Sequence, residues 1–117
     1  QEASKANGIR STSEWLRQSS YQNIANEVAY QVKELLQPVL KVDAFFFATN
    51  TLAVESLKII NQLGIKVPED LAIVSFDESD AFDFFYSPLT YISQPLEDIG
   101  KSAVNLVIDR INNQEKK

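Results

Sequence analysis

The chain has 117 residues, a formal net charge of −5 and the composition of an ordinary globular protein. This length allows one domain with a real core, and the negative charge with scattered Lys and Arg argues against a surface that grips a phosphate backbone. The absence of cysteine and histidine excludes disulfides, thiolate zinc sites and Ser–His relays. No apolar run approaches the length of a membrane span, and the first residues lack the pattern of a signal peptide.

The first residues predict the end of a helix. Residues 1–7 have helical character, and Gly8 can take the left-handed conformation that closes a helix. Because Gln1 already lies inside this helix, we expect the chain to be a piece of a longer protein. Residues 9–18 are ambiguous, since Trp15 fits either a short strand or a single helical turn.

A longer helix is predicted next. Ser19 with Gln22 fits a capping box that opens a helix, and Pro38 ends it after about Leu36. Apolar residues at helical spacing form a stripe that faces the core: Ile24, Val28, Val32 and Leu35.

The middle of the chain predicts buried strands joined by a helix. Residues 44–48 and 71–76 are continuous apolar runs without alternation, which is typical of strands buried on both faces. A helix over 50–63 separates them, residues 67–70 form a turn, and a third short strand follows at 89–92. Alternating helices and apolar strands predict an α/β fold, a parallel sheet with helices on both faces.

The last predicted helix begins at Pro95, a residue suited to a first helical turn. Its polar residues after Asn112 are expected to fray. We expect one face to point inward, made of Leu96, Ile99, Ala103, Leu106 and Ile111.

Two strand ends are the predicted ligand-binding edge. The first strand ends in Thr49 and Asn50, and the second ends in Asp77 and Glu78. In an open α/β sheet, ligands bind just beyond the carboxyl ends of the strands. A ligand would therefore be recognised where these polar side chains meet.

Several motifs in one order carry a family resemblance. The sequence reads ATN after the first strand, then GIKVPEDLAIVSFDE, SPLTYISQP and IGKSA. In this spacing they closely resemble the effector-binding domain of the LacI/GalR family of bacterial transcription regulators, a fold shared with periplasmic sugar-binding proteins. The specific match covers residues 43–111, and the helix at 20–36 fits more loosely.

The resemblance implies two α/β lobes joined by three crossovers, with a small effector between them. Residues 1–88 would form the C-terminal lobe without its first strand, 89–94 a crossover strand, and 95–117 a terminal helix that packs on the absent N-terminal lobe. The parent is then expected to be a cytoplasmic homodimer that senses a sugar or a nucleobase-like molecule and binds operator DNA through a headpiece outside this chain. It implies no enzyme activity, cofactor, metal or membrane.

Asp77 is the first candidate for an effector contact. A carboxylate at a strand end can accept hydrogen bonds from two neighbouring hydroxyls, and the resemblance implies this role. The alternative is that Asp77 only anchors its own loop through backbone amides. Thr49 and Asn50 depart from the usual Asn and Asp of the family. Either could contact the effector, although helix capping is the favoured reading of Asn50.

Three other residues are candidates at this site. Trp15 and Tyr21 compete for the role of an aromatic platform, on which the C–H face of a sugar packs. A core position is the alternative for Trp15. Gln94 could reach the cleft, but an N-terminal cap of the last helix is the favoured reading.

The aromatic residues between 82 and 86 predict an interface. A core can absorb one or two of them, and the others would form an apolar patch. The resemblance implies that this loop and the 50–63 helix take part in homodimer contacts, through Val54, Phe84, Phe85 and Tyr86.

Two other classes of function compete with a regulator. A periplasmic sugar receptor for a transporter or sensor would share the fold, and the residues before Gln1 would tell the two apart. A phosphoacceptor or flavodoxin-like enzyme is disfavoured, because the strand end at Thr49 lacks a carboxylate and the chain has no glycine-rich phosphate loop.

Overall fold

A three-stranded parallel sheet is the centre of the molecule. The computed structural model describes residues 2–10 and 12–114, and its strands lie in the order β1 (Ala44–Phe47), β2 (Ala72–Phe76) and β3 (Thr90–Ile92). Both strand pairs are parallel, with Phe45 opposite Ile73 and Val74 opposite Thr90. The predicted parallel α/β architecture is therefore confirmed.

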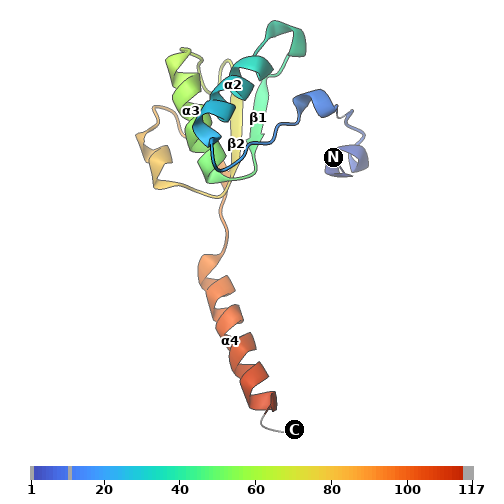
Figure 1. Ribbon diagram of the computed structural model, residues 1–117, viewed down its shortest axis with the longest axis vertical. Coiled ribbons are helices and arrows are strands. Elements are labelled where there is room, and N and C mark those ends of the chain that lie inside the picture. The colour runs from blue at the N-terminus through green and yellow to red at the C-terminus, as the bar shows by residue number, and fades with distance from the viewer. Residues whose placement is uncertain (1, 11, 115–117) are drawn as a thin grey trace.

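Two helices cover one face of this sheet. α2 (Ile24–Leu35) and α3 (Asn50–Gln62) pack against each other and lie side by side along the sheet (Figure 1). Exposure alternates along β1, with Phe45 buried and Phe46 63% exposed. The core between sheet and helices consists of Val28, Val32, Leu35, Phe45, Ala53, Leu57, Ile60, Val67, Leu71, Ile73 and Phe82.

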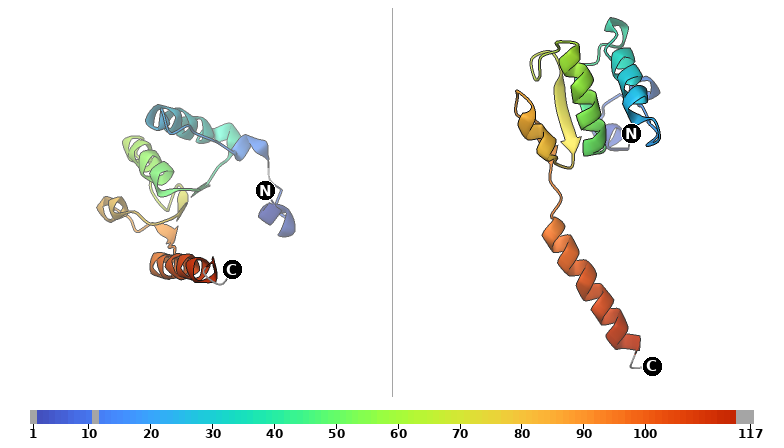
Figure 2. Two further views of the ribbon diagram at one scale, coloured as in Figure 1. Left: turned by 60° about the horizontal axis from the view of Figure 1, so that its bottom comes forward. Right: turned by 60° about the vertical axis from the view of Figure 1, so that its left-hand side comes forward.

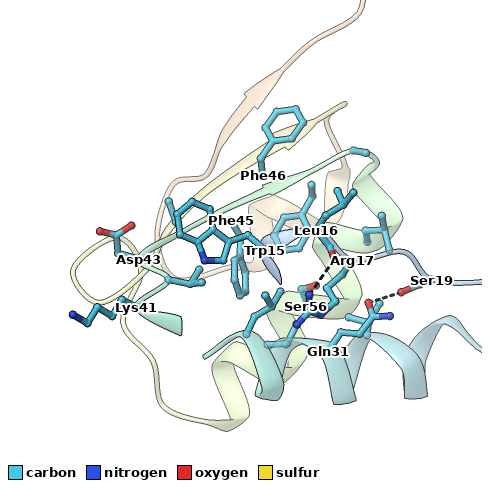
Figure 3. A pocket seen from close by; sticks show the side chains of 18 residues that line it. Trp15, Leu16, Arg17, Ser19, Gln31, Lys41, Asp43, Phe45, Phe46 and Ser56 are labelled. Atoms are coloured by element: carbon cyan, nitrogen blue, oxygen red, sulfur yellow. Dashed lines mark hydrogen bonds between the residues drawn. The ribbon is translucent and has the colours of Figure 1, made fainter. Parts of the chain in front are cut away.

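The opposite face of the sheet is open in the described part of the chain. Phe46 points away from the helices, as the close view in Figure 3 shows, and Ile92 of β3 is also exposed. The sequence predicts helices on both faces, and within residues 2–10 and 12–114 only one face carries them. The continuous apolar run of β1 is consistent with a second face that needs cover.

α2 begins later than the capping-box pattern predicts. Its first residue is Ile24, and its N-cap residue Asn23 makes no side-chain capping bond. Ser20 instead binds Glu27, since its backbone N–H and its hydroxyl each donate to the carboxylate at 2.7 Å. These two hydrogen bonds, with the one from the backbone foremost, lower the pKa of Glu27 below its ordinary value.

The segment before α2 is strapped to that helix. The Arg17 guanidinium pairs with Glu34 at 3.1 Å, and the Ser19 hydroxyl donates to Gln31 at 2.9 Å. Together with Ser20, these residues bind α2 at positions Glu27, Gln31 and Glu34, which share one helical face. The Ser19–Gln22 capping box is therefore wrong, because Ser19 binds α2 from outside the helix.

The ambiguous segment 9–18 forms no strand. α1 ends at Ala6 (Glu2–Ala6), and Gly8, two residues later, has a left-handed φ of +67°, as predicted. A single 3-10 turn, η1 (Ser13–Trp15), follows, and its N-cap Thr12 accepts a hydrogen bond from the Glu14 N–H at 2.9 Å. The helical-turn alternative for Trp15 is the one observed.

α4 (Leu96–Gln114) leaves the sheet and runs away from it, as two views agree (Figures 1 and 2). The expectation that one of its faces points inward is not met within this chain, because Leu106 is 66% exposed and Leu96 68%. Fraying after Asn112 is also not seen, since the helix continues to Gln114; residues 115–117 lie outside the described residues.

A 3-10 turn, η2 (Pro38–Leu40), connects α2 to β1.

Candidate functional site

Polar groups from three strand ends meet at the carboxyl edge of the sheet. Thr49 and Asn50 follow β1, Asp77 follows β2, and Gln94 follows β3 by two residues. The parallel register brings these ends together, because Phe76 lies opposite Ile92 and Phe47 lies opposite Ser75. This edge is the candidate ligand site.

Asp77 is held by both its backbone and its side chain. Its N–H donates to the carbonyl of Ile92 at 3.0 Å, and its own carbonyl accepts from the buried Ser75 hydroxyl at 3.2 Å. Its φ of +74° is left-handed, a conformation that aspartate tolerates better than most residues. The half-buried carboxylate accepts a hydrogen bond from the side-chain amide of Gln94. The hydrogen-bond partner of the Asp77 carboxylate is thus a side chain, whereas its loop is anchored through the backbone of Asp77.

Gln94 contributes its side chain to this edge. α4 begins at Leu96, and the Pro95 carbonyl accepts the first helical hydrogen bond, from Ile99 at 3.0 Å. The favoured reading of Gln94 as the cap of this helix is therefore wrong, since its amide nitrogen reaches back to Asp77 Oδ1. Its amide oxygen is an acceptor next to the carboxylate.

Thr49 and Asn50 have exchanged the expected roles. The Thr49 hydroxyl accepts a hydrogen bond from the Leu52 N–H at 3.3 Å, so Thr49 is the N-cap of α3. The reading of Asn50 as the cap is wrong, because its side-chain amide donates to the Glu78 carbonyl at 2.8 Å. Asn50 therefore connects the ends of β1 and β2, and both side chains remain half-buried at the edge.

Ser75 is a residue of this site that sequence reasoning missed. It is 1% exposed and ties the end of β2 to the backbone of Asp77. The signal was present, because Ser75 is the one hydroxyl in the apolar run LAIVSF and stands two residues before the carboxylate. A buried hydroxyl needs a partner, and here the partner is the turn that carries Asp77.

The two aromatic platform candidates lie in different places. Trp15 lines a cavity of about 640 Å³ along the outer edge of β1, with Phe45 on the same wall (Figure 3). Asp77 follows β2, on the other side of β1, so the structure does not bring Trp15 to Asp77. The core reading of Trp15 does not hold either, since it is 50% exposed.

Tyr21 lies in the loop that leads into α2 and is 79% exposed. The short connection through η2 makes α2 run antiparallel to β1, so the start of α2 lies at the carboxyl edge of the sheet. Tyr21 is therefore the platform candidate on the same side as Asp77.

The aromatic loop divides between core and surface. In η3 (Asp80–Phe84), Phe82 is 7% exposed and lies 6.0 Å from Tyr91 between ring centroids, whereas Phe84 is 89% exposed. Phe85 packs partly against the core, and the Tyr86 hydroxyl accepts from the Val67 N–H at 2.6 Å. The core thus absorbs Phe82 fully, and Phe84 is the ring most available to a partner.

The chemistry of the edge is that of recognition. Among residues 2–10 and 12–114, no group of His, Cys, Asp and Glu is arranged to hold a metal ion, and none of the helices has the length and apolar character to span a bilayer. The edge offers a carboxylate, two carboxamides and a hydroxyl. Such groups bind the O–H and N–H groups of a small molecule.

The comparisons with known proteins point to one family. The family model described as periplasmic binding protein-like domain matches residues 1–117. The HTH-type transcriptional repressor PurR of Aliivibrio salmonicida is 31% identical over 111 residues, which are 95% of this chain and 32% of the relative. The HTH-type transcriptional regulator CelR of Thermobifida fusca is 34% identical over 83 residues, which are 71% of this chain and 24% of the relative.

Solved structures give the same result. A transcriptional regulator CelR–cellobiose complex matches with a TM-score of 0.79 and 28% identity, over 97% of this chain and 34% of that one. The transcription regulator CcpA of Lactococcus lactis matches with a TM-score of 0.78 and 26% identity, over 96% of this chain and 40% of that one. The chain spans about a third or less of the length of the two curated relatives.

Proposed function

Because this chain belongs to the periplasmic binding protein-like domain family, we propose that it is the ligand-sensing part of a bacterial LacI-type transcription regulator. The parent binds a small effector, a sugar in first place, between two lobes and thereby controls its binding to operator DNA. The relatives named above are regulators rather than enzymes, and the complex with cellobiose supports a sugar for the CelR regulator.

The observation that carries the proposal is the Asp77–Gln94 pair at the carboxyl edge. Gln94 orients the carboxylate, and the acceptors of the pair are available to the hydroxyls of a sugar. Asn50 holds the two strand ends together. The Thr49 hydroxyl accepts the capping hydrogen bond of α3 and can make at most one further contact, to the effector. Tyr21 is the proposed platform for the sugar ring.

The remaining parts of the parent follow from the same proposal. Residues 1–88 form most of the C-terminal lobe, β3 is one crossover, and α4 packs on an N-terminal lobe outside this chain. The exposed apolar residues of α4 support this arrangement, since a soluble helix rarely leaves so many unpartnered. Phe84, Phe85, Tyr86 and Val54 are proposed as homodimer contacts.

Effector binding would act on DNA by favouring one angle between the lobes. A ligand shifts such an equilibrium only as far as it binds one arrangement more tightly than the other. Contacts from both lobes supply that difference, and the paired headpieces then sit differently on the operator.

The test uses the full-length parent. It is titrated in a calorimeter with cellobiose, other disaccharides and nucleobases to identify a ligand. The same titration is then repeated with Asp77→Ala. We expect the affinity to fall at least about tenfold, because a hydrogen bond to a charged partner contributes about 1.5–3 kcal/mol. Unchanged affinity in Asp77→Ala would remove this residue from the site, and a ligand that leaves operator affinity unchanged would contradict the regulatory role.

A further inference from the structure

We infer that the carboxyl edge of this sheet selects uncharged or positively charged effectors and discriminates against phosphorylated or otherwise anionic ones. This inference rests on the proposed function, because it names the chemical class of ligand for the same site. The observations that carry it are the distribution of charge around the edge and the hydrogen-bonding groups that the edge presents.

Negative charge dominates the segments that follow the strand ends. No Lys or Arg stands between Phe76 and Gly100, and none stands between Val42 and Leu57, so every segment that follows a strand end here lacks a cation. The acidic residues in the first of these stretches are Asp77, Glu78, Asp80, Asp83, Glu97 and Asp98, of which Glu97 is paired with Lys101.

The lysines nearest to these two stretches in the sequence lie at the other end of the sheet or are already paired. Lys58 binds Glu55 at 2.6 Å and Lys101 binds Glu97 at 2.7 Å, so the lysine that follows each stretch is already paired with a carboxylate. Lys41 and Lys66 come before β1 and β2, at the amino end of the sheet. An anion at the carboxyl edge would therefore find no ammonium or guanidinium group on the segments that directly follow β1, β2 and β3.

The N-terminus of α3 does not reverse this balance. A helix N-terminus contributes about half a positive charge and is a common anion site. Here the Thr49 hydroxyl already takes the Leu52 N–H, and Asp77 and Glu78 place two full negative charges at the next strand end. These two full charges outweigh the partial positive charge of the helix end.

The hydrogen-bonding groups favour the same class of ligand. Asp77 is an acceptor, and Gln94 directs its N–H toward Asp77, which leaves the amide oxygen as a second acceptor. Two adjacent acceptors match two O–H or N–H donors, as on a sugar diol or a protonated amine. A phosphate dianion brings only acceptors, so it would face lone pairs and negative charge together.

The experiment compares matched ligands on the full-length protein. Glucose, trehalose and sucrose are titrated beside their 6-phosphate esters, and inorganic phosphate is tested by thermal shift. Two charge reversals are compared: Glu78→Lys, whose exposed side chain lies at the carboxyl edge, and Glu69→Lys, which is exposed in the turn before β2 at the other end. Both change the net charge equally.

We expect each neutral sugar that binds to do so at least about tenfold more tightly than its ester. We expect Glu78→Lys to reduce the ratio of sugar affinity to ester affinity, and Glu69→Lys to leave that ratio unchanged. Inorganic phosphate should not bind at this edge in the wild type. The thermal shift that phosphate causes should therefore be the same in the wild type and in Glu69→Lys. An ester that binds as tightly as its sugar, or a phosphate shift in the wild type that Glu78→Lys strengthens, overturns the inference.

Failure of the inference and of the proposed function look different. A phosphorylated sugar that binds tightly and changes operator affinity leaves the regulator intact and removes only the charge preference. A neutral sugar that binds more tightly than its ester but leaves operator affinity unchanged keeps the charge preference and removes the regulatory role.

Discussion

Helices α3 and α4 both have apolar residues at helical spacing, but those of α3 are buried and those of α4 are exposed. On α3, Ile60 is fully buried and Leu57 is 6% exposed, whereas Leu106 on α4 is 66% exposed. α3 lies between two strands that pair with each other, so short connections fold it back on the sheet. α4 follows the last strand and has no such constraint. Periodicity thus predicts a helix and its apolar face, but not the partner of that face.

The largest effect is expected from Leu57→Ala in the 1–117 chain. This change should lower the free energy of unfolding by about 2–5 kcal/mol, because it removes buried methyl groups and leaves a cavity beneath the sheet. Urea unfolding followed by circular dichroism measures it. A loss no greater than that of an exposed substitution would mean that the α3 face is not packed as described.

A smaller effect is expected from the cap of α3. Thr49→Ala should destabilise the chain by about 0.5–2 kcal/mol, since the Leu52 N–H loses its acceptor. Thr49→Ser is the control and should retain most of the stability, because it keeps the hydroxyl. α4 has Pro95 at the corresponding position and no side-chain acceptor there, so this measurement shows how much of the difference between the helices lies in their first turns.

The smallest effect is expected from Leu106→Ala, the same chemical change on α4. In the 1–117 chain it should alter the free energy of unfolding by less than about 0.5 kcal/mol, because Leu106 has little packing to lose. In the full-length parent the cost should approach that of Leu57→Ala if α4 packs on the other lobe. Equal, small costs in both forms would refute that packing.

Much of the sheet and its helices is predictable from the sequence. The apolar runs locate β1 and β2 to within a residue, because nothing else in the chain is so continuously apolar. The start of α2 was not predictable from local pattern, since Ser19 and Ser20 bind Gln31 and Glu27 a turn or more inside the helix. A capping box and such a strap use the same residue types, and only the fold distinguishes them.

The position of the candidate ligand site could be predicted from the sequence, but its hydrogen-bond partners could not. Strand ends in a parallel sheet converge whatever their side chains, which is why Asp77 and Thr49 could be placed at one edge. The partners could not be inferred in the same way. Asn50 and Gln94 each have a side chain long enough to cap a helix or to cross to the next strand end, and here both cross.

The strap between residues 17–20 and α2 has a mechanical consequence. Its bonds end on the helix, at Glu27, Gln31 and Glu34, and a cavity separates the segment from β1. Tyr21, directly after the strap, is therefore carried by α2, while Asp77 is carried by the strands. Any sliding of α2 over the strands would change the distance between the Tyr21 ring and the Asp77 carboxylate, the two proposed effector contacts.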